Sequence, residues 1–361
     1  MFRFSLYFIV LVCALGCQGQ LEVFSATQLP VATMAPPTGG ATTENTDVLY
    51  YDYSEDIEWS KCKPLPPNMT ASKTGQKAWD KCIEYQEQYV YPCERSLGLT
   101  FTSSYIRHSH CTQNTNVFSL GHVAADGKRE FPHMALLGFG DESHVSFMCG
   151  GSIVSENYIL TAAHCTSSRD LGPVAYALVG IIEISENYDK EKLYKIKKII
   201  NHPEYIPPHK YNDIALLETN KRIKMNPLVV PACLDTGNQE VEEALTLSWG
   251  ANGRANADDF QKLKLSKFSQ EECAGFFPSR RLMRRGVDPK TQVCYGNKLQ
   301  SNKTCQGESG NPLHIRSDRI KCMHVVVGVT SFGRACGSIG PPGIYTRVAE
   351  YLPWIESIVW P

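Results

Sequence analysis

The chain has 361 residues, and its 36 basic and 37 acidic side chains leave a formal net charge of −1. That balance excludes a typical nucleic-acid-binding protein, because such proteins carry a strongly basic face. The length is enough for two domains, or for one large domain with an appendage, and the 42% hydrophobic content can build a core. The 14 cysteines are scattered along the whole length without paired CxxC spacing, which indicates an oxidising compartment and not zinc knuckles.

The N-terminus has the pattern of a secretory signal peptide, which we assign to residues 1–20. A basic residue, Arg3, precedes a short apolar run, Phe4–Gly16. A membrane anchor needs about 20 apolar residues, so this run is too short for one, and no later segment is long enough. Cleavage would remove Cys13 and Cys17 and leave 12 of the 14 cysteines, an even number that can all pair. We therefore expect a secreted, extracellular protein without membrane attachment.

Residues 21–60 are expected to be a disordered linker. Ser25–Thr46 is rich in Ala, Thr, Pro and Gly and has too few large apolar residues for a core. In the following stretch, 47–58, three tyrosines lie among acidic residues. Tyrosine sulfation or docking to a basic partner is one interpretation, and a solvated acidic linker is the alternative that such charge runs favour.

Residues 61–118 form a cysteine-containing segment with a helix-like stretch, Ala78–Val90. The segment is too small to build its own core without disulfides. It also contains a glycosylation sequon at Asn68, which we expect to be exposed.

From about Ser119 onward, short apolar runs alternate with turns that contain Gly, Pro and Asn. Many short strands at this spacing predict an all-β sandwich or barrel. The stretch from Tyr351 to Trp360 has helical periodicity instead and is expected to close the chain as a helix. The expected strands are Met134–Phe139, Gly151–Thr161, Tyr176–Ile184, Lys195–Ile200, Asp213–Leu217, Ala244–Trp249, Val325–Ser331 and Gly343–Val348.

Three segments of this region supply a histidine, an aspartate and a serine, in that order. A serine hydroxyl is a poor nucleophile at neutral pH, so it needs a histidine to accept its proton and a buried carboxylate to orient that histidine. Glycines before the serine allow backbone N–H groups to face the oxyanion that develops in acyl transfer. The segments are Leu160-Thr-Ala-Ala-His-Cys165, Tyr211-Asn-Asp-Ile-Ala-Leu-Leu217 and Thr304-Cys-Gln-Gly-Glu-Ser-Gly-Asn-Pro-Leu313.

These segments, together with Ser248-Trp-Gly250, Thr330-Ser-Phe-Gly333 and Pro342-Gly-Ile-Tyr-Thr-Arg-Val348, resemble the chymotrypsin-like (trypsin-family) serine endopeptidases. The order His, Asp, Ser separates that family from subtilisins and α/β-hydrolases. The resemblance covers residues 119–361, which we take as the protease domain. It implies two antiparallel six-stranded β-barrels with the active site between them, a C-terminal helix, and a disulfide-tethered, largely irregular N-terminal segment.

The resemblance also implies a role for each site residue. His164 would be the general base, Asp213 its orienting carboxylate and Ser309 the nucleophile. The N–H groups of Gly307 and Ser309 would form the oxyanion hole. The residues that would hold the substrate backbone or line its primary pocket are Lys303, Ser331, Phe332, Gly333 and Gly343.

The cysteines fit the same resemblance. The pairs that match the family's bridges are Cys149 with Cys165, Cys273 with Cys294, Cys305 with Cys336, and Cys111 with Cys233, the last of which would tether the N-terminal segment after activation. The phrases Lys81-Cys-Ile-Glu-Tyr85, Glu130-Phe-Pro-His-Met134 and Val327-Gly-Val-Thr-Ser-Phe-Gly333 resemble arthropod clip-domain proteases of the snake and easter type. A complete clip module has six cysteines, which this segment does not supply. For the remaining cysteines we expect Cys62 to pair with Cys93 and Cys82 with Cys322.

Four positions depart from the family pattern. Enzymes of this family are activated by a cut after Arg or Lys that frees an apolar N-terminus, and here the matching residue is Ser119, preceded by Phe118. The freed ammonium normally pairs with an Asp before the serine, where this chain has Glu308. Lys303 stands where trypsin-like enzymes have an Asp at the bottom of the primary specificity pocket. A working site would therefore prefer an acidic or neutral residue before the scissile bond. Asn311 replaces a glycine at a position that we expect to need positive φ.

Two hypotheses follow. The first is a secreted serine endopeptidase zymogen in an extracellular cascade of immunity or development, with protein substrates, an upstream activating protease and serpin-type inhibitors as partners. The alternative is a catalytically impaired homologue that binds other proteases as a cofactor module. The complete triad favours the first, and the altered activation and pocket residues support the second. Neither requires a metal or an organic cofactor, and we expect a monomer with no nucleic-acid partner and no membrane contact.

Overall fold

The chain divides into two compact units, Met1–Asp52 and Tyr53–Pro361. The computed structural model describes residues 61–96, 104–111, 123–124, 130–180, 188–238, 240–249, 260–298, 309–333 and 341–361, all of which belong to the second unit. The expected signal peptide and linker lie outside the described residues. No helix in the described ranges is long and apolar enough to cross a membrane.

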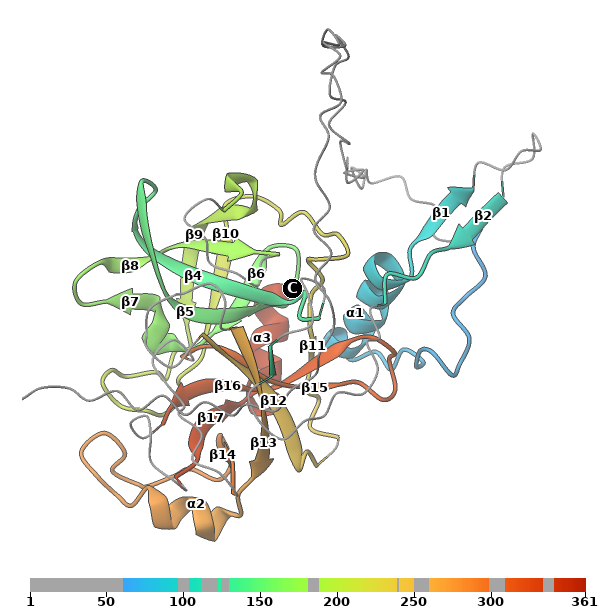
Figure 1. Ribbon diagram of the computed structural model, residues 1–361. Helices are drawn as coiled ribbons and strands as arrows, with labels where there is room; N and C mark the ends of the chain where they lie inside the picture. Colours follow the sequence, from blue (N-terminus) through green and yellow to red (C-terminus); the bar gives the residue numbers. More distant parts are fainter. Residues whose placement is uncertain are drawn as a thin grey trace, which may run out of the picture. The chain divides into compact units, whose positions relative to one another are not determined.

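The first half of the second unit is a closed antiparallel barrel of six strands. The strands follow one another around the barrel in the order β4, β5, β6, β10, β9, β8, and pairing of β4 with β8 closes it (Figure 1). A further short strand, β7 (Ser167–Ser168), pairs antiparallel with the start of β8. The six strands are β4 (Met134–Asp141), β5 (His144–Ile153), β6 (Tyr158–Thr161), β8 (Gly172–Val179), β9 (Leu193–Asn201) and β10 (Ala215–Thr219).

The second half is a second closed barrel of six antiparallel strands, in the order β16, β15, β12, β13, β14, β17, closed by pairing of β16 with β17. Two short strands pair with strands of this barrel: β11 (Cys233–Leu234) runs parallel to β16, and β3 (Val123–Ala124) runs antiparallel to β13. The two-barrel prediction is therefore confirmed. The six strands are β12 (Glu243–Trp249), β13 (Phe260–Lys267), β14 (Gln292–Gly296), β15 (Pro312–Arg316), β16 (His324–Phe332) and β17 (Gly343–Arg347).

The strand boundaries show what the local pattern missed. The apolar run Gly151–Thr161 was expected to be one strand, but it contains the end of β5, a turn and all of β6. The Ser155 hydroxyl accepts hydrogen bonds from the N–H groups of Asn157 and Tyr158, at 3.3 and 3.1 Å, and this local bonding turns the chain. Strand β13 was not predicted, although lysines alternate with its buried leucines in the pattern of a half-buried strand.

Helices lie at the periphery and between the barrels. The helix-like stretch at Ala78–Val90 is α1 (Lys77–Tyr85) continued by a π-helix, η2 (Gln86–Val90). Helix α2 (Gln270–Phe276) starts with a capping box formed by Ser269 and Glu272. The predicted C-terminal helix is confirmed as α3 (Leu352–Val359). The short 3₁₀ helices are η3 (Ala163–Thr166), η4 (Lys190–Lys192) and η6 (Val348–Tyr351).

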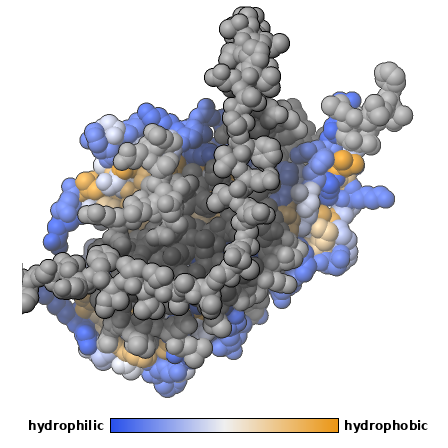
Figure 2. Space-filling view, viewed as in Figure 1, coloured by the Kyte–Doolittle hydropathy of each residue, from blue (hydrophilic) through white to orange (hydrophobic). Residues whose placement is uncertain are grey.

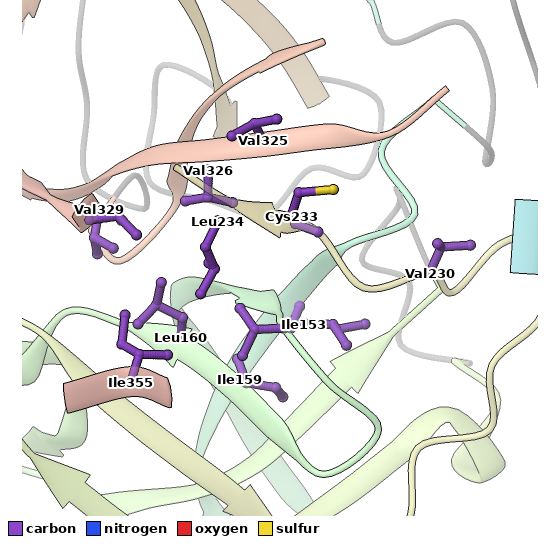
Figure 3. Close-up of a cluster of buried hydrophobic side chains, with 14 of the residues drawn as sticks. Ile153, Ile159, Leu160, Val230, Cys233, Leu234, Val325, Val326, Val329 and Ile355 are labelled. Atoms are coloured by element: carbon purple, nitrogen blue, oxygen red, sulfur yellow. The ribbon is translucent and has the colours of Figure 1, made fainter. Parts of the chain in front are cut away.

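The main core lies where the two barrels and α3 meet. Figure 3 shows Leu160 of β6 beside Ile355 of α3, with Val326 and Val329 of β16 on the other side of Leu160. These side chains are almost completely buried. Burial of each large aliphatic side chain contributes roughly 1.5–3 kcal/mol, so this shared core fixes one barrel against the other.

Described large hydrophobic side chains that remain exposed are single residues on separate segments. On the face in Figure 2, the described surface is mostly hydrophilic with small hydrophobic groups between. Isolated exposed hydrophobic residues of this kind are normal for a folded domain. They are Ile106, Met148, Leu171, Ile206 and Leu282.

The cysteine-containing segment packs on the rest of the second unit through α1. The N–H of Ala78 donates to Glu356 of α3 at 2.8 Å, and Lys77 Nζ donates to the carbonyl of Trp360 at 2.5 Å. Gln86 is completely buried and donates to the carbonyls of Met69 and Lys321, both at 2.8 Å. A buried amide that joins two segments in this way rigidifies their packing. Beyond α1 the segment forms a hairpin of β1 (Cys93–Ser96) and β2 (Ser104–Arg107).

The disulfides correct two expected pairings. Cys82 pairs with Cys233, and Cys111 pairs with Cys322, so the expected pairs Cys111–Cys233 and Cys82–Cys322 are wrong. Helix α1 contacts β11, which brings the Cα atoms of Cys82 and Cys233 to 5.0 Å. The Cα atoms of Cys111 and Cys322 lie 5.6 Å apart. Connectivity cannot be deduced from sequence alone, because it depends on such distances. The other bridges in the described residues are Cys62–Cys93, Cys149–Cys165 and Cys273–Cys294, as expected.

Candidate active site

His164 and Asp213 come from the ends of neighbouring strands of the first barrel. His164 lies in η3, three residues after β6, and Asp213 lies two residues before β10. Strands β6 and β10 are paired, with Thr161 opposite Ala215. The sheet therefore carries the histidine and the carboxylate to the same edge of the barrel.

The Asp213 carboxylate is fully buried and holds His164 at two points. The main-chain N–H of His164 donates to Asp213 Oδ1 at 2.9 Å, and the ring atom His164 Nδ1 lies 2.8 Å from Asp213 Oδ2. An ionised carboxylate can only accept, so Nδ1 must carry a hydrogen, and in the neutral form of the ring Nε2 then has a free lone pair. The arrangement fixes both the orientation and the tautomer of the ring.

A third group, the Ser331 hydroxyl of β16, also donates to Asp213 Oδ2. Burial alone would raise the pKa of this carboxyl. The hydrogen bond and charge of His164, followed by the hydrogen bond of Ser331, outweigh burial and hold the pKa of Asp213 below its usual value. Asp213 is therefore ionised at neutral pH although it lies inside the protein. Ser331 was expected to contact substrate through its backbone, and its side-chain role was missed because nothing local to the motif reveals it.

Ser309 is half-buried, and main-chain hydrogen bonds hold the turn before β15 that carries it. The Ser309 carbonyl accepts from Gly150 of β5 at 2.9 Å, and the N–H of Gly310 donates to Thr330 of β16 at 2.9 Å. Gly310 has φ +76°, and a Cβ atom there would overlap the carbonyl oxygen of Gly150 and the hydroxyl of Thr161. Only glycine meets both conditions.

Asn311 does not have the positive φ that we expected, and this prediction is wrong. The Asn311 side chain fits because residue 150 is a glycine. A Cβ atom on Gly150 would collide with Asn311 Oδ1. Asn311 Nδ2 donates to the carbonyl of Leu247 in β12 at 2.8 Å. The asparagine therefore fills space over β5 and joins β5, β12 and the serine turn.

Within the part of the chain that the structure describes, no hydrogen bond joins the Ser309 hydroxyl to His164. His164 Nε2 lies 3.8 Å from Cys165 Sγ. Hydrogen bonds of catalytic groups are often long before substrate binds and shorten in the complex. The described residues also contain one group with metal-ligand spacing, Cys149, His164 and Cys165, but both of its sulfur atoms belong to one disulfide and are not thiolate ligands.

The expected substrate strand is the end of β16. Phe332 of β16 pairs with Ile344 of β17, so Gly343 at the start of β17 lies beside that end. The Phe332 ring packs edge-on against Phe277 with centroids 5.7 Å apart, and Lys210 Nζ lies 5.5 Å from its centroid. The strand end therefore presents an aromatic surface with a cation beside it. The sequence analysis did not identify Lys210, which precedes the Tyr211 motif.

Several expected site residues lie outside the described residues. They are the activation residues, the pocket and oxyanion residues that precede Ser309, and one cysteine pair: Ser119, Lys303, Cys305, Gly307, Glu308 and Cys336. The sequon residue Asn68 lies in a turn and is exposed, the location that a glycosylated asparagine requires.

Comparison with protein families decides the classification. The model described as Trypsin matches residues 120–355. The chain belongs to the trypsin family. The match spans both barrels and ends at Ile355 within α3, and it leaves the cysteine-containing segment 61–118 outside.

Curated members of the trypsin family extend the comparison into that segment. The chain is 33% identical over 288 residues to serine protease snk of Drosophila melanogaster, which covers 78% of this chain and 64% of snk. It is 31% identical over 293 residues to phenoloxidase-activating factor 3 of Holotrichia diomphalia, covering 76% and 81% of the two chains. It is 32% identical over 252 residues to CLIP domain-containing serine protease B4 of Anopheles gambiae, covering 64% and 68%. The resemblance to arthropod clip-domain proteases is confirmed.

Proposed function

We propose that this member of the trypsin family is a secreted serine endopeptidase that cleaves peptide bonds with Ser309, His164 and Asp213. The observation that carries the proposal is the fully buried, ionised Asp213, which receives two hydrogen bonds from His164 and one from Ser331. A buried carboxylate is costly to maintain unless it is fully hydrogen-bonded. Its preservation here supports retention of catalysis and not only of the fold.

In the proposed reaction, Ser309 Oγ attacks the carbonyl carbon of the scissile bond while His164 Nε2 accepts the hydroxyl proton. Asp213 stabilises the imidazolium that forms, through the Nδ1–H bond. The N–H groups of Gly307 and Ser309 are proposed to stabilise the oxyanion. His164 then gives its proton to the leaving amine, which leaves an acyl-enzyme. Water deacylates this intermediate by the same route and restores the serine.

We propose that the substrate lies along the end of β16, from Ser331 to Gly333, as an added strand. Lys303 is assigned to the primary pocket, where a cation favours an acidic or neutral residue before the scissile bond over Arg or Lys. The side chain of Lys210, next to Phe332, adds a second positive charge along the same strand. Both cations support an acidic substrate segment.

We assign the chain to an extracellular proteolytic cascade as a zymogen. Its relatives include a protein named phenoloxidase-activating factor 3 and several named CLIP domain-containing serine proteases. The apolar N-terminal run supports secretion, and the disulfides of the described residues fit an oxidising compartment. Protein substrates, an upstream protease that cuts before Ser119, and serpin-type inhibitors are the proposed partners.

Active-site labelling tests the proposal. The purified secreted protein is treated with a fluorophosphonate before and after a chymotryptic cut at Phe118–Ser119, which N-terminal sequencing verifies. We expect labelling after the cut, none in Ser309→Ala, and unchanged labelling in Ser143→Ala, which removes an exposed hydroxyl from the β4–β5 turn. Absence of labelling in correctly cut, folded protein would reject catalysis and favour a cofactor module for other proteases.

A further inference from the structure

Three buried histidines outside the active site face one another where the two barrels meet. His133 immediately precedes β4 of the first barrel, His314 lies in β15, and His324 begins β16 of the second. Their exposed fractions are 1%, 0% and 8%. Fully buried histidines are uncommon, and three together are not needed to fill space that leucine or phenylalanine could fill.

The three rings are mutually adjacent. Their centroids lie 5.0 Å apart for His133 and His314, 4.9 Å for His133 and His324, and 5.2 Å for His314 and His324. A zinc ion bound to imidazole nitrogen at about 2.0–2.1 Å lies about 3 Å from the ring centroid. Three imidazoles around a tetrahedral ion therefore have centroids about 5 Å apart. The observed triangle has these dimensions.

Five of the six ring nitrogens have no hydrogen-bond partner among the described residues, and the exception is Nε2 of His324. Both nitrogens of His133, both of His314 and Nδ1 of His324 are buried and make no hydrogen bond to the described residues. A neutral imidazole has one donor and one acceptor, and leaving them unpaired inside a protein costs stability. Five buried nitrogens without hydrogen-bond partners are unusual in one place, and a bound metal ion would give some of them a partner.

The protonation state suits ligation. Burial, reinforced by the neighbouring rings, holds the pKa of His133 well below the ordinary value, and burial has the same effect on His314. For His324, burial and the nearby Arg316 lower the pKa to about 4. The rings are therefore neutral at pH 7, which is the form that binds metal. The charged side chain closest to the rings in its effect is Arg316, which donates to the Glu130 carboxylate at 3.4 Å, while Lys262 donates to the same carboxylate at 2.9 Å.

We propose that His133, His314 and His324 form a zinc site that joins the first barrel to the β15–β16 pair. Imidazole-only donor sets suit Zn²⁺, with Cu²⁺ and Ni²⁺ as competitors. In the ring orientations of the structure the three nitrogens do not all lie within 4.8 Å of one another, so binding requires rotation about the Cβ–Cγ bond. That torsion is broad and roughly two-fold for histidine, so a rotation that exchanges ring nitrogen and carbon positions is accessible.

The location gives the site a structural role. The His133 carbonyl accepts from Ile153 of β5 at 2.7 Å, which fixes the start of β4 to the first barrel. Strand β15 begins three residues after Ser309, and β16 contains Ser331 close to its end. A zinc ion here would bind these elements together, and none of its three ligands belongs to the proposed triad.

Zinc analysis of the intact secreted protein tests the proposal. The full chain, produced in zinc-supplemented medium and purified in metal-free buffer, is expected to carry one zinc per chain by mass spectrometry. His314→Gln is expected to weaken zinc binding at least about 100-fold, because it removes a ligand and not only an outer contact. His202→Gln, at a half-buried histidine that packs edge-on against Tyr351 and Trp354, is the matched control and is expected to retain zinc.

Two further variants keep the test decisive. His324→Phe preserves aromatic packing at the least buried ring, so it separates loss of a ligand from failure to fold; we expect it to fold, to lose zinc, and to show no rise in Tm on zinc addition. Replacement of zinc by Co²⁺ is expected to give a visible absorption spectrum in the wild-type chain that His324→Phe lacks. Folded wild-type protein without zinc, zinc retained in His324→Phe, or zinc lost in His164→Gln, which would locate it at the active site, would overturn the proposal.

Discussion

The two sides of the candidate active site are held in different ways. On the first barrel, His164 is oriented by hydrogen bonds from its main chain and its ring to one carboxylate, Asp213, which also accepts from Ser331 of the second barrel. On the second barrel, Ser309 depends on main-chain hydrogen bonds to neighbouring strands and on the absence of a side chain at Gly310. One side is fixed by charge and hydrogen bonding, and the other by shape.

This difference predicts different sensitivities. The His164 side should respond to substitutions that keep shape and change hydrogen bonding, with little loss of stability. The Ser309 side should respond to added volume, with loss of both stability and activity. The following variants separate these two behaviours.

The largest effect is expected for Asp213→Asn. An amide in place of the carboxylate favours the wrong tautomer of His164, so kcat/KM of the cut protein should fall by roughly 10⁴-fold. Activity against a peptide substrate and Tm are measured together, with Asp170→Asn, on an exposed loop, as the control. A loss of less than about 10-fold would contradict the assigned role of Asp213.

Gly310→Ala should reduce stability most. The substitution combines a strained positive φ with overlap against Gly150 and Thr161, and we expect a loss of about 2–5 kcal/mol in the free energy of unfolding. Urea unfolding measures the loss. Gly275→Ala is the matched control, since a Cβ atom there meets nothing within 4 Å and the residue lies in α2, where alanine is favoured over glycine.

Gly150 and Asn311 should be coupled. Gly150→Ala places a methyl group in the space that Asn311 Oδ1 fills, which should cost about 1–3 kcal/mol in the free energy of unfolding. In the double variant with Asn311→Ala, that overlap disappears, so the cost of Gly150→Ala should be much smaller than in the wild-type background. Additive effects in this double-mutant cycle would show that the two positions do not share the space.

The smallest effect is a pH dependence of stability. The pKa of Asp213 in the folded protein is below its ordinary value. Above the pKa of the unfolded chain, about 3.9, the ionised carboxylate therefore stabilises the folded state. This stabilisation is lost as the pH falls through the lower pKa of the folded state. Unfolding of wild type and Asp213→Asn is compared from pH 7 to pH 2. The wild type should lose more stability below about pH 4 than the variant, and parallel curves would contradict the shift.

The sequence predicted features that depend on short segments. Three local motifs located His164, Asp213 and Ser309, and the repeat of short apolar runs predicted an all-β sandwich or barrel, because a strand's pattern reflects its own two faces. The two barrels themselves were implied only by the resemblance to the chymotrypsin-like proteases. The pairing of Cys82 and Cys111 depended on where α1 packs, which no local pattern records. The space shared by Gly150 and Asn311, more than 150 residues apart, was missed for the same reason. Our expectation at Asn311 assumed that its own backbone would adapt, whereas the adaptation lies in the opposite strand.

The two bridges of the N-terminal segment have a consequence for what happens after a cut at Phe118–Ser119. Cys82–Cys233 and Cys111–Cys322 each connect residues before the cut to residues after it. If a reductant opens one bridge, the other keeps the two thiols at a high effective concentration, so the opened bridge re-forms more readily than it exchanges with a partner. The cut protein should therefore migrate as a single species without reductant and as two fragments with it. Any glycan at Asn68, and any part of the N-terminal segment that binds a cell surface or matrix, would therefore stay attached to the protease domain after the cut.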